Sequence, residues 1–207
     1  MELVLLSDTH GRHGEVEIPN GDVLIHAGDF GAWFGTMEEL EEFNDFLGQL
    51  PHAHKIVVAG NHDFCFERAN ADARKALTNA HYLQDESLEI DGVKFYGSPW
   101  QPEFLNLAFN LRRGEPLRRK WEMVPPDTDV LITHGPPHGI GDETLDGLHV
   151  GCEELLLRVK QVKPRVHVFG HIHEGRGKYE IEGTVFVNAV TNRAGRSPFL
   201  LSLTIAI

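Results

Sequence analysis

Short apolar runs rich in β-branched residues recur along the whole chain, and several of them end in glycine and polar residues. Helical patterns lie between the early runs, whereas the late runs follow one another more closely. This arrangement predicts an α/β fold with at least one mixed sheet. The expected strands are Leu3–Leu6, Val23–His26, Lys55–Ala59, Lys94–Tyr96, Val130–Thr133, Val166–Phe169, Thr184–Val187 and a final run Phe199–Ile207.

Three segments have the spacing of apolar residues that is typical of helices. Met37–Leu50 is the clearest, because Thr36 is a good N-cap and two glutamates stand in the first turn. Asn70–Leu77 and Cys152–Val162 are the other two, and Pro164 stops the last one. No internal repeat and no low-complexity linker divides the sequence, so a single domain over residues 1–207 is expected.

Composition narrows the classes of function. The formal net charge is −12 without a dense Lys/Arg tract, so binding to long nucleic acid is not expected. No apolar run approaches the ~20 residues of a membrane span, and the start of the chain lacks the features of a signal peptide. A cytoplasmic protein without a membrane partner is therefore expected. Cys65 and Cys152 form no close-spaced pair, which argues against a disulfide framework and a cysteine zinc site.

Residues that can bind metal ions follow the first two predicted strands. Leu3–Leu6 leads into Asp8-Thr9-His10, and residues two apart in an extended segment point the same way. Asp8 and His10 can therefore converge, although a solvated turn in which Asp8 caps a following helix is the favoured explanation for this motif on its own. Val23–His26 leads into Ala27-Gly28-Asp29, where a carboxylate can bridge two cations, but Gly-Asp is also common in turns.

Three of the later predicted strands end in the same way. Lys55–Ala59 runs into Gly60-Asn61-His62-Asp63, Val130–Thr133 delivers His134, and Val166–Phe169 delivers Gly170-His171-Ile172-His173. Each block alone could be an ordinary turn or a surface histidine. Ligands of open α/β folds gather at the carboxyl ends of strands, however, and five strand ends here carry Asp, Asn or His. Mixed oxygen and imidazole donors suit Mn²⁺, Fe²⁺ or Zn²⁺.

With these blocks in order, the chain resembles the calcineurin-like metallophosphoesterase superfamily. The blocks are Asp-x-His, Gly-Asp, Gly-Asn-His-Asp, a lone His and Gly-His-x-His, and the combination is specific. A closer likeness is to the small metallophosphodiesterases called MPPED proteins, and it weakens only after Asn188-Ala189. It rests on the segments His26–Phe30, Tyr96–Pro102, Thr133–Pro137 and Phe169–Gly175.

The resemblance implies a layered α/β/β/α sandwich with two mixed β-sheets and two divalent metal ions at the strand ends. It assigns one metal to Asp8, His10 and His173, the other to Asn61, His134 and His171, and makes Asp29 the bridging ligand. His62 would lie beside the scissile phosphate and donate a proton to the leaving group, with Asp63 as a candidate to orient it. Mn²⁺ is the expected metal, with Fe²⁺, Fe³⁺ or Zn²⁺ as alternatives.

The expected activity is hydrolysis of small phosphodiesters or cyclic nucleotides. A non-catalytic metal-binding scaffold for protein partners remains an alternative, as does a phosphomonoesterase or protein phosphatase. Intact His62 and seven intact ligand positions favour an enzyme.

The stretch 97–128 has no clear periodicity, and long irregular segments are often functional. Trp100 could provide an aromatic face for substrate, and Arg112 or Arg113 a guanidinium for phosphate. For Phe104 and Phe109 we expect core packing.

Overall fold

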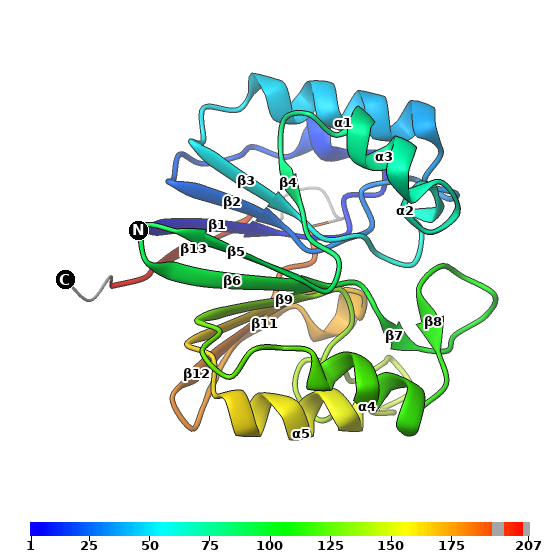
Figure 1. Ribbon diagram of the computed structural model, residues 1–207, viewed down its shortest axis with the longest axis vertical. Helices are drawn as coiled ribbons and strands as arrows, with labels where there is room; N and C mark the ends of the chain where they lie inside the picture. Colours follow the sequence, from blue (N-terminus) through cyan, green and yellow to red (C-terminus); the bar gives the residue numbers. More distant parts are fainter. Residues whose placement is uncertain (192–196, 205–207) are drawn as a thin grey trace.

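Two β-sheets packed face to face form the centre of the computed structural model, which describes residues 1–191 and 197–204 (Figure 1). The first sheet has the order β13-β1-β2-β3-β4, and only β13 runs antiparallel to its neighbour. Its strands are β1 (Glu2–Leu6), β2 (Val23–His26), β3 (His54–Val57), β4 (His81–Tyr82) and β13 (Phe199–Ser202).

The second sheet has the order β11-β12-β10-β9-β6-β5, with antiparallel pairs at both edges and parallel strands between them. Its strands are β5 (Glu86–Ile90), β6 (Val93–Ser98), β9 (Val130–Thr133), β10 (Val166–Phe169), β11 (Gly177–Ile181) and β12 (Thr184–Asn188). Two mixed sheets are therefore present, as expected. A short parallel pair of β7 (Gln101–Pro102) and β8 (Asn110–Leu111) lies outside them.

Helices cover the outer face of each sheet, which completes an α/β/β/α sandwich (Figure 1). The first sheet is covered by α1 (Met37–Gln49), α2 (Phe64–Arg68) and α3 (Asn70–Ala76), and the second by α4 (Glu115–Glu122) and α5 (Glu153–Val162). None of the helices in the described part of the chain has the length and hydropathy that crossing a membrane requires.

The alternation of side chains in β1 shows why its run is apolar throughout. Leu3 and Leu5 point into the core between the two sheets, where they meet residues such as Phe95 and Val168. The intervening residues Val4 and Leu6 point the other way, into the core under the helices. Because both faces of a sandwiched sheet are buried, the four residues after the exposed Glu2 are all apolar.

Most predicted elements are confirmed within a few residues. Helix α1 begins after Thr36, whose hydroxyl accepts from the amide of Glu39 while the Glu39 carboxylate accepts from the Thr36 amide. The last predicted strand is shorter than expected, because β13 ends at Ser202 and residues 205–207 lie outside the described part.

The stretch 97–128 is more regular than the sequence indicates. It contains the end of β6, the β7–β8 pair and helix α4. Helix α4 escaped prediction because only Leu117 and Trp121, one turn apart, are buried, and the rest of this eight-residue helix is charged or proline. The short elements α2, β4, β5 and β11 were also not predicted.

Candidate metal centre

The carboxyl ends of parallel strands from both sheets meet at one edge of the sandwich. The loop after β1 contacts the loop after β2, where the Asp8 amide donates to the Gly28 carbonyl at 2.9 Å. It also contacts the second sheet, because the His171 amide donates to the Asp8 carboxylate at 3.0 Å. All seven predicted ligands are brought together there, at the junction of the two sheets: Asp8, His10, Asp29, Asn61, His134, His171 and His173.

The backbone turns sharply at the ligands, which corrects one part of the sequence argument. Asp8, His10, Asp29 and His171 all have positive φ, between 45° and 68°. Asp8 and His10 therefore do not converge as alternate residues of an extended strand, since β1 already ends at Leu6. Left-handed turns direct the two side chains inward instead, and Asp and His tolerate this conformation better than branched residues do.

Three groups of side chains have their donor atoms within 4.8 Å of one another. One group is Asp8, His10 and His173, another is Asp29, His134 and His171, and the third is His10, Asp29 and His62. The first group has the same residues as one metal site assigned by resemblance. The second joins two ligands of the other assigned site, His134 and His171, to the bridging residue Asp29.

Short distances place Asp29 between the two groups. Its Oδ2 lies 3.4 Å from His134 Nε2 and 3.9 Å from His10 Nε2. Asp8 Oδ1 lies 3.4 Å from His173 Nε2, and Asn61 Oδ1 lies 2.9 Å from His134 Nε2. One carboxylate thus faces histidines of both groups, as a bridging ligand must.

Contacts behind the ligands fix their orientation. His134 Nδ1 lies 2.9 Å from the Ala27 carbonyl, so this nitrogen carries the hydrogen and Nε2 faces the centre. The Ser7 hydroxyl donates to Asp8 Oδ2 at 2.6 Å, and the His62 amide donates to Asp29 Oδ1 at 2.8 Å. Each carboxylate therefore has one oxygen held by the protein and the other directed at the histidines.

Glycine is required at two of the strand ends because the chain passes too close to the ligands for a side chain. A Cβ on Gly60 would lie 2.2 Å from Asp29 Oδ1, and a Cβ on Gly170 would lie 2.1 Å from Asp8 Oδ2. The glycines of the Gly-Asn-His-Asp and Gly-His-x-His blocks therefore allow the carboxylates to pack against the backbone of neighbouring loops.

The carboxylates of Asp8 and Asp29 stay ionised although they are buried, because histidines compensate their charge. Burial opposes ionisation of Asp8, but its hydrogen bond with His173 and the charge of His134 hold the pKa well below its usual value. For Asp29, burial is outweighed by His134, which lowers the pKa to about 2. Burial disfavours a charged His134, yet Asp29 raises the pKa of this histidine to about 9.

The positive charge that the two carboxylates need is carried by a proton on His134 or, when a metal ion is bound through Nε2, by that ion instead. Ionised carboxylates, imidazoles and an amide oxygen together form a donor set that fits divalent transition metals. The residues present therefore fit a metal centre.

His62 and Asp63 are both present at the centre, but their relation differs from the one expected. His62 Nδ1 lies 3.1 Å from the Trp33 carbonyl, and its ring is 5.1 Å from that of His10. The Asp63 carboxylate instead accepts from the backbone amides of Asp29, Gly31 and Gly60, at 2.7–3.0 Å. The expectation that Asp63 orients His62 is therefore wrong. A backbone carbonyl does so, and no residue type in the sequence could reveal it.

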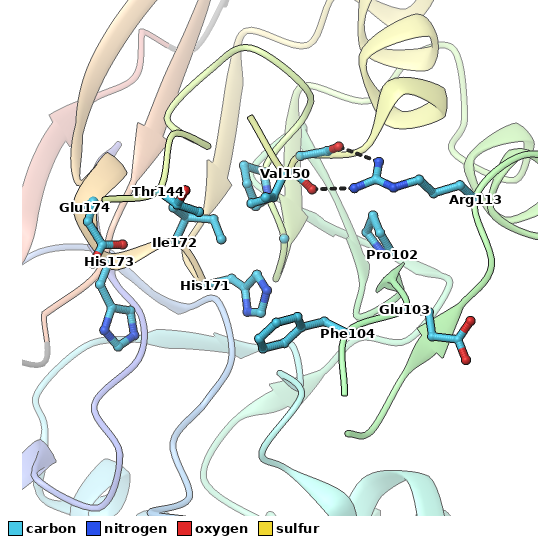
Figure 2. Close-up of a pocket in the computed structure, with 13 residues that line it drawn as sticks. Pro102, Glu103, Phe104, Arg113, Thr144, Val150, His171, Ile172, His173 and Glu174 are labelled. Atoms are coloured by element: carbon cyan, nitrogen blue, oxygen red, sulfur yellow. Dashed lines mark hydrogen bonds between the residues drawn. The ribbon is translucent and has the colours of Figure 1, made fainter. Parts of the chain in front are cut away.

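Two cavities adjoin the centre and share three lining residues, Phe104, His171 and His173. The smaller, of about 380 Å³, extends past Thr144 and Val150 (Figure 2). The larger, of about 690 Å³, contains His10, Asp29, Asn61 and His62, with Trp33 and Phe34 in its wall. Figure 2 shows the Phe104 ring beside His171. The two ring centroids lie 6.3 Å apart, and both residues line the two cavities.

The predicted substrate contacts are only partly where the sequence placed them. Trp100 lines neither cavity: its Nε1 donates to Asp85 Oδ2 at 2.9 Å, and Lys120 Nζ lies 4.3 Å from the ring centre. Arg112 is exposed and lines neither cavity, which corrects its assignment as a substrate ligand.

Two other residues of the same stretch, Arg113 and Phe104, line the cavities in place of Arg112 and Trp100. Arg113 lines the smaller cavity, and its guanidinium donates to the carbonyls of Val150 and Gly151 at 2.7 Å (Figure 2). Phe109 is buried, as expected, but Phe104 is half exposed and lines both cavities. A lone phenylalanine in an irregular segment carries no sequence signal that separates these two outcomes.

Known proteins match this chain in sequence and in fold. Residues 1–199 match the calcineurin-like phosphoesterase superfamily domain. The chain is similar to the human metallophosphoesterase domain-containing protein 1, at 44% identity over 90% of this chain, and spans 64% of that protein. A UPF0046 protein of Caenorhabditis elegans is 43% identical, over 94% of this chain and 71% of its own length. A solved structure that is 19% identical aligns with a TM-score of 0.68 over 90% of this chain and 89% of its own, which supports the fold.

Proposed function

Since the chain belongs to the calcineurin-like phosphoesterase superfamily, we propose that it is a hydrolase of phosphodiesters that uses two divalent metal ions. Asp8, His10 and His173 would hold one ion, and Asn61, His134 and His171 the other. Asp29 would contact both, because its Oδ2 faces histidines of the two groups. When bound, such ions lower the pKa of water and stabilise the charge that develops on phosphate oxygens.

One observation favours a diester over a monoester. The candidate metal ligands His171 and His173 line both cavities, so a phosphate held there has room for a substituent on each side. A phosphodiester carries two ester groups, whereas a monoester would leave one cavity unused. Small diesters with two separate ester groups are therefore the proposed substrates. Cyclic nucleotides, whose two ester oxygens belong to one ribose, are the second candidate class, on family resemblance alone.

His62 is the proposed proton donor to the leaving oxygen. A carbonyl only accepts, so the contact with Trp33 places a hydrogen on Nδ1 and leaves Nε2 as the atom that holds the transferable proton. General acids placed in this way contribute about 10²–10⁴ in rate. Asp63 has a different part, because its three backbone contacts tie the loops that carry Asp29 and His62 together.

The net charge of −12 is compatible with an anionic substrate because local charge decides binding. Two divalent ions carry four positive charges, of which Asp8 and Asp29 neutralise two. Mn²⁺ is the proposed metal, since the histidine-rich donor set suits it better than Mg²⁺, with iron or zinc as alternatives. A cytoplasmic location is part of the same proposal, and no protein partner is assigned.

The deciding experiment is metal removal followed by reconstitution. Chelated protein should lose hydrolysis of bis-(p-nitrophenyl) phosphate, and Mn²⁺ should restore it better than Mg²⁺. The restored protein should also prefer this diester to p-nitrophenyl phosphate. Full activity in demonstrably metal-free protein would refute metal dependence, and no activity with any metal would favour the scaffold alternative. A preference for the monoester would favour a phosphomonoesterase.

A further inference from the structure

An unusual concentration of exposed apolar side chains surrounds the larger cavity. Among the residues that the structure describes, ten large apolar side chains are exposed, and four of them line this one cavity. They are Trp33, Phe34, Phe104 and Leu105, with exposed fractions of 72%, 67%, 54% and 69%. Water contact with so much apolar surface is unfavourable, so a patch of this kind at a cavity marks a binding site.

The loop that carries Trp33 and Phe34 is held in place by its backbone. The Gly31 amide donates to Asp63, the Ala32 amide donates to Glu39 at 3.1 Å, and the Gly35 carbonyl accepts from the Cys65 amide at 2.9 Å. Gly35 also packs so closely that a Cβ there would lie 2.4 Å from the His62 carbonyl oxygen. The two aromatic rings are therefore presented to solvent by a fixed loop.

The same loop touches the proposed proton donor. The Trp33 carbonyl contacts His62 Nδ1, and the two rings lie 6.4 Å apart at an angle of 74°. His62 lines the larger cavity and is absent from the lining of the smaller one. A group that receives a proton from His62 must therefore enter the cavity with the aromatic wall.

We propose that the cavity walled by Trp33, Phe34 and Leu105 binds the leaving group of the substrate, and that this leaving group is aromatic or otherwise apolar. The ester group that stays on phosphorus then occupies the smaller cavity, which Thr144, Val150 and Ile172 line (Figure 2). Phe104 separates the two subsites. This inference rests on the proposed function, because it uses the role of His62 to decide which cavity receives which ester group.

Two substrates with one leaving group but different retained groups test the assignment. In methyl p-nitrophenyl phosphate and bis-(p-nitrophenyl) phosphate, nitrophenolate leaves from both, and only the retained group differs. With Mn²⁺-loaded full chain, Trp33→Ala and Phe34→Ala should each raise KM about 5- to 10-fold for both substrates, with a much smaller change in kcat. Leu157→Ala, which removes an equally exposed apolar side chain on α5, is the matched control and should change neither constant.

Each other kinetic pattern overturns the assignment. A rise in KM for the bis-ester alone would place the retained group in the aromatic cavity. Unchanged KM for both substrates in both variants would remove Trp33 and Phe34 from substrate binding and point to contact with another macromolecule. Melting temperatures of the variants confirm that folding is intact.

A binding measurement separates this inference from the proposed function. Phenyl methylphosphonate has one ester group, which is aromatic, and methyl methylphosphonate is its small counterpart. Calorimetry on Mn²⁺-loaded protein should show about tenfold tighter binding of the phenyl compound, and the preference should disappear in Trp33→Ala but persist in Leu157→Ala. A preference that persists in both aromatic variants would overturn the inference even if the protein hydrolyses diesters. If Trp33→Ala loses the preference for the phenyl compound but the wild type hydrolyses no ester, the subsite is supported and the proposed hydrolase activity is refuted.

Discussion

The two candidate metal groups share Asp29 but differ in their access to solvent. His134, Asp29 and Asn61 are almost completely buried, and only His171 in this group is half-buried. In the other group the His10 and His173 side chains are 20% and 31% exposed, and only Asp8 is fully buried. Ligands that are buried and held by packing lose less freedom on binding a metal than ligands at the surface. We therefore expect the Asn61–His134–His171 site to retain its ion longer than the Asp8–His10–His173 site during chelation.

Removing the shared ligand should abolish the difference between the two sites. Asp29→Ala deletes the one carboxylate that faces both groups, so both sites should lose affinity and hydrolysis should fall to background. Elemental analysis after gel filtration measures metal per chain, with Asp22→Ala as a control at an exposed carboxylate. Two retained ions per chain would contradict the bridging assignment.

The second prediction leaves both metal sites intact. His62→Ala should keep the metal content of the wild type and lower kcat for a diester by about 10²–10⁴. The loss should be smaller for a nitrophenyl ester than for a cyclic nucleotide, because an acidic leaving group needs little protonation. Measurements of kcat on both substrates decide the matter, and equal losses would favour phosphate positioning over proton donation.

The third prediction separates the two sites. His173→Ala removes a ligand from the exposed group only, so the Asp8–His10 site should lose at least 10-fold in metal affinity while the buried site stays filled. Metal-stripped protein is titrated with Mn²⁺, and the electron paramagnetic resonance signal of Mn²⁺ measures the affinity of each site. If His173→Ala instead weakened the Asn61–His134–His171 site and left the Asp8–His10 site unchanged, the ligand assignment would be reversed.

The smallest effect concerns a residue behind the ligands. Ser7→Ala removes the hydroxyl that donates to Asp8 Oδ2, so the exposed site should weaken by about tenfold and the buried site should not change. The same metal titration measures it. A comparable weakening of both sites would mean that Ser7 acts through the packing of the two loops rather than through Asp8.

Much of the site was predictable because its ligands follow strand ends. Apolar runs locate β1, β2, β3, β9 and β10, and parallel strands bring the residues that follow them to one edge. The backbone conformation was not predictable in this way. Asp8 and His171 reach the centre through left-handed turns, and the His171 amide donates to the Asp8 carboxylate across the two sheets. A contact between segments so far apart in the sequence leaves no pattern in the residues around either one.

The predictions in the 97–128 stretch were less successful for a physical reason. Residue type alone does not say whether an aromatic ring enters a core or a cavity wall. Trp100 was therefore expected at the substrate and Phe104 in the core, whereas Phe104 lines both cavities and Trp100 lines neither. Likewise, the adjacent Arg112 and Arg113 differ only in the direction that the loop gives them. The single-domain prediction for residues 1–207 stays a prediction.

The sequence by itself determined the α/β pattern, the order of five ligand blocks and hence the family. These features are local, since each consists of an apolar strand followed within a few residues by its ligands. Only the tertiary structure decided that Asp63 ties loops together, that the Trp33 carbonyl orients His62, and that Trp33 and Phe34 wall a cavity. Those features depend on contacts between segments that are 29 or more residues apart in the sequence and on backbone atoms that every residue carries, so residue type leaves no record of them.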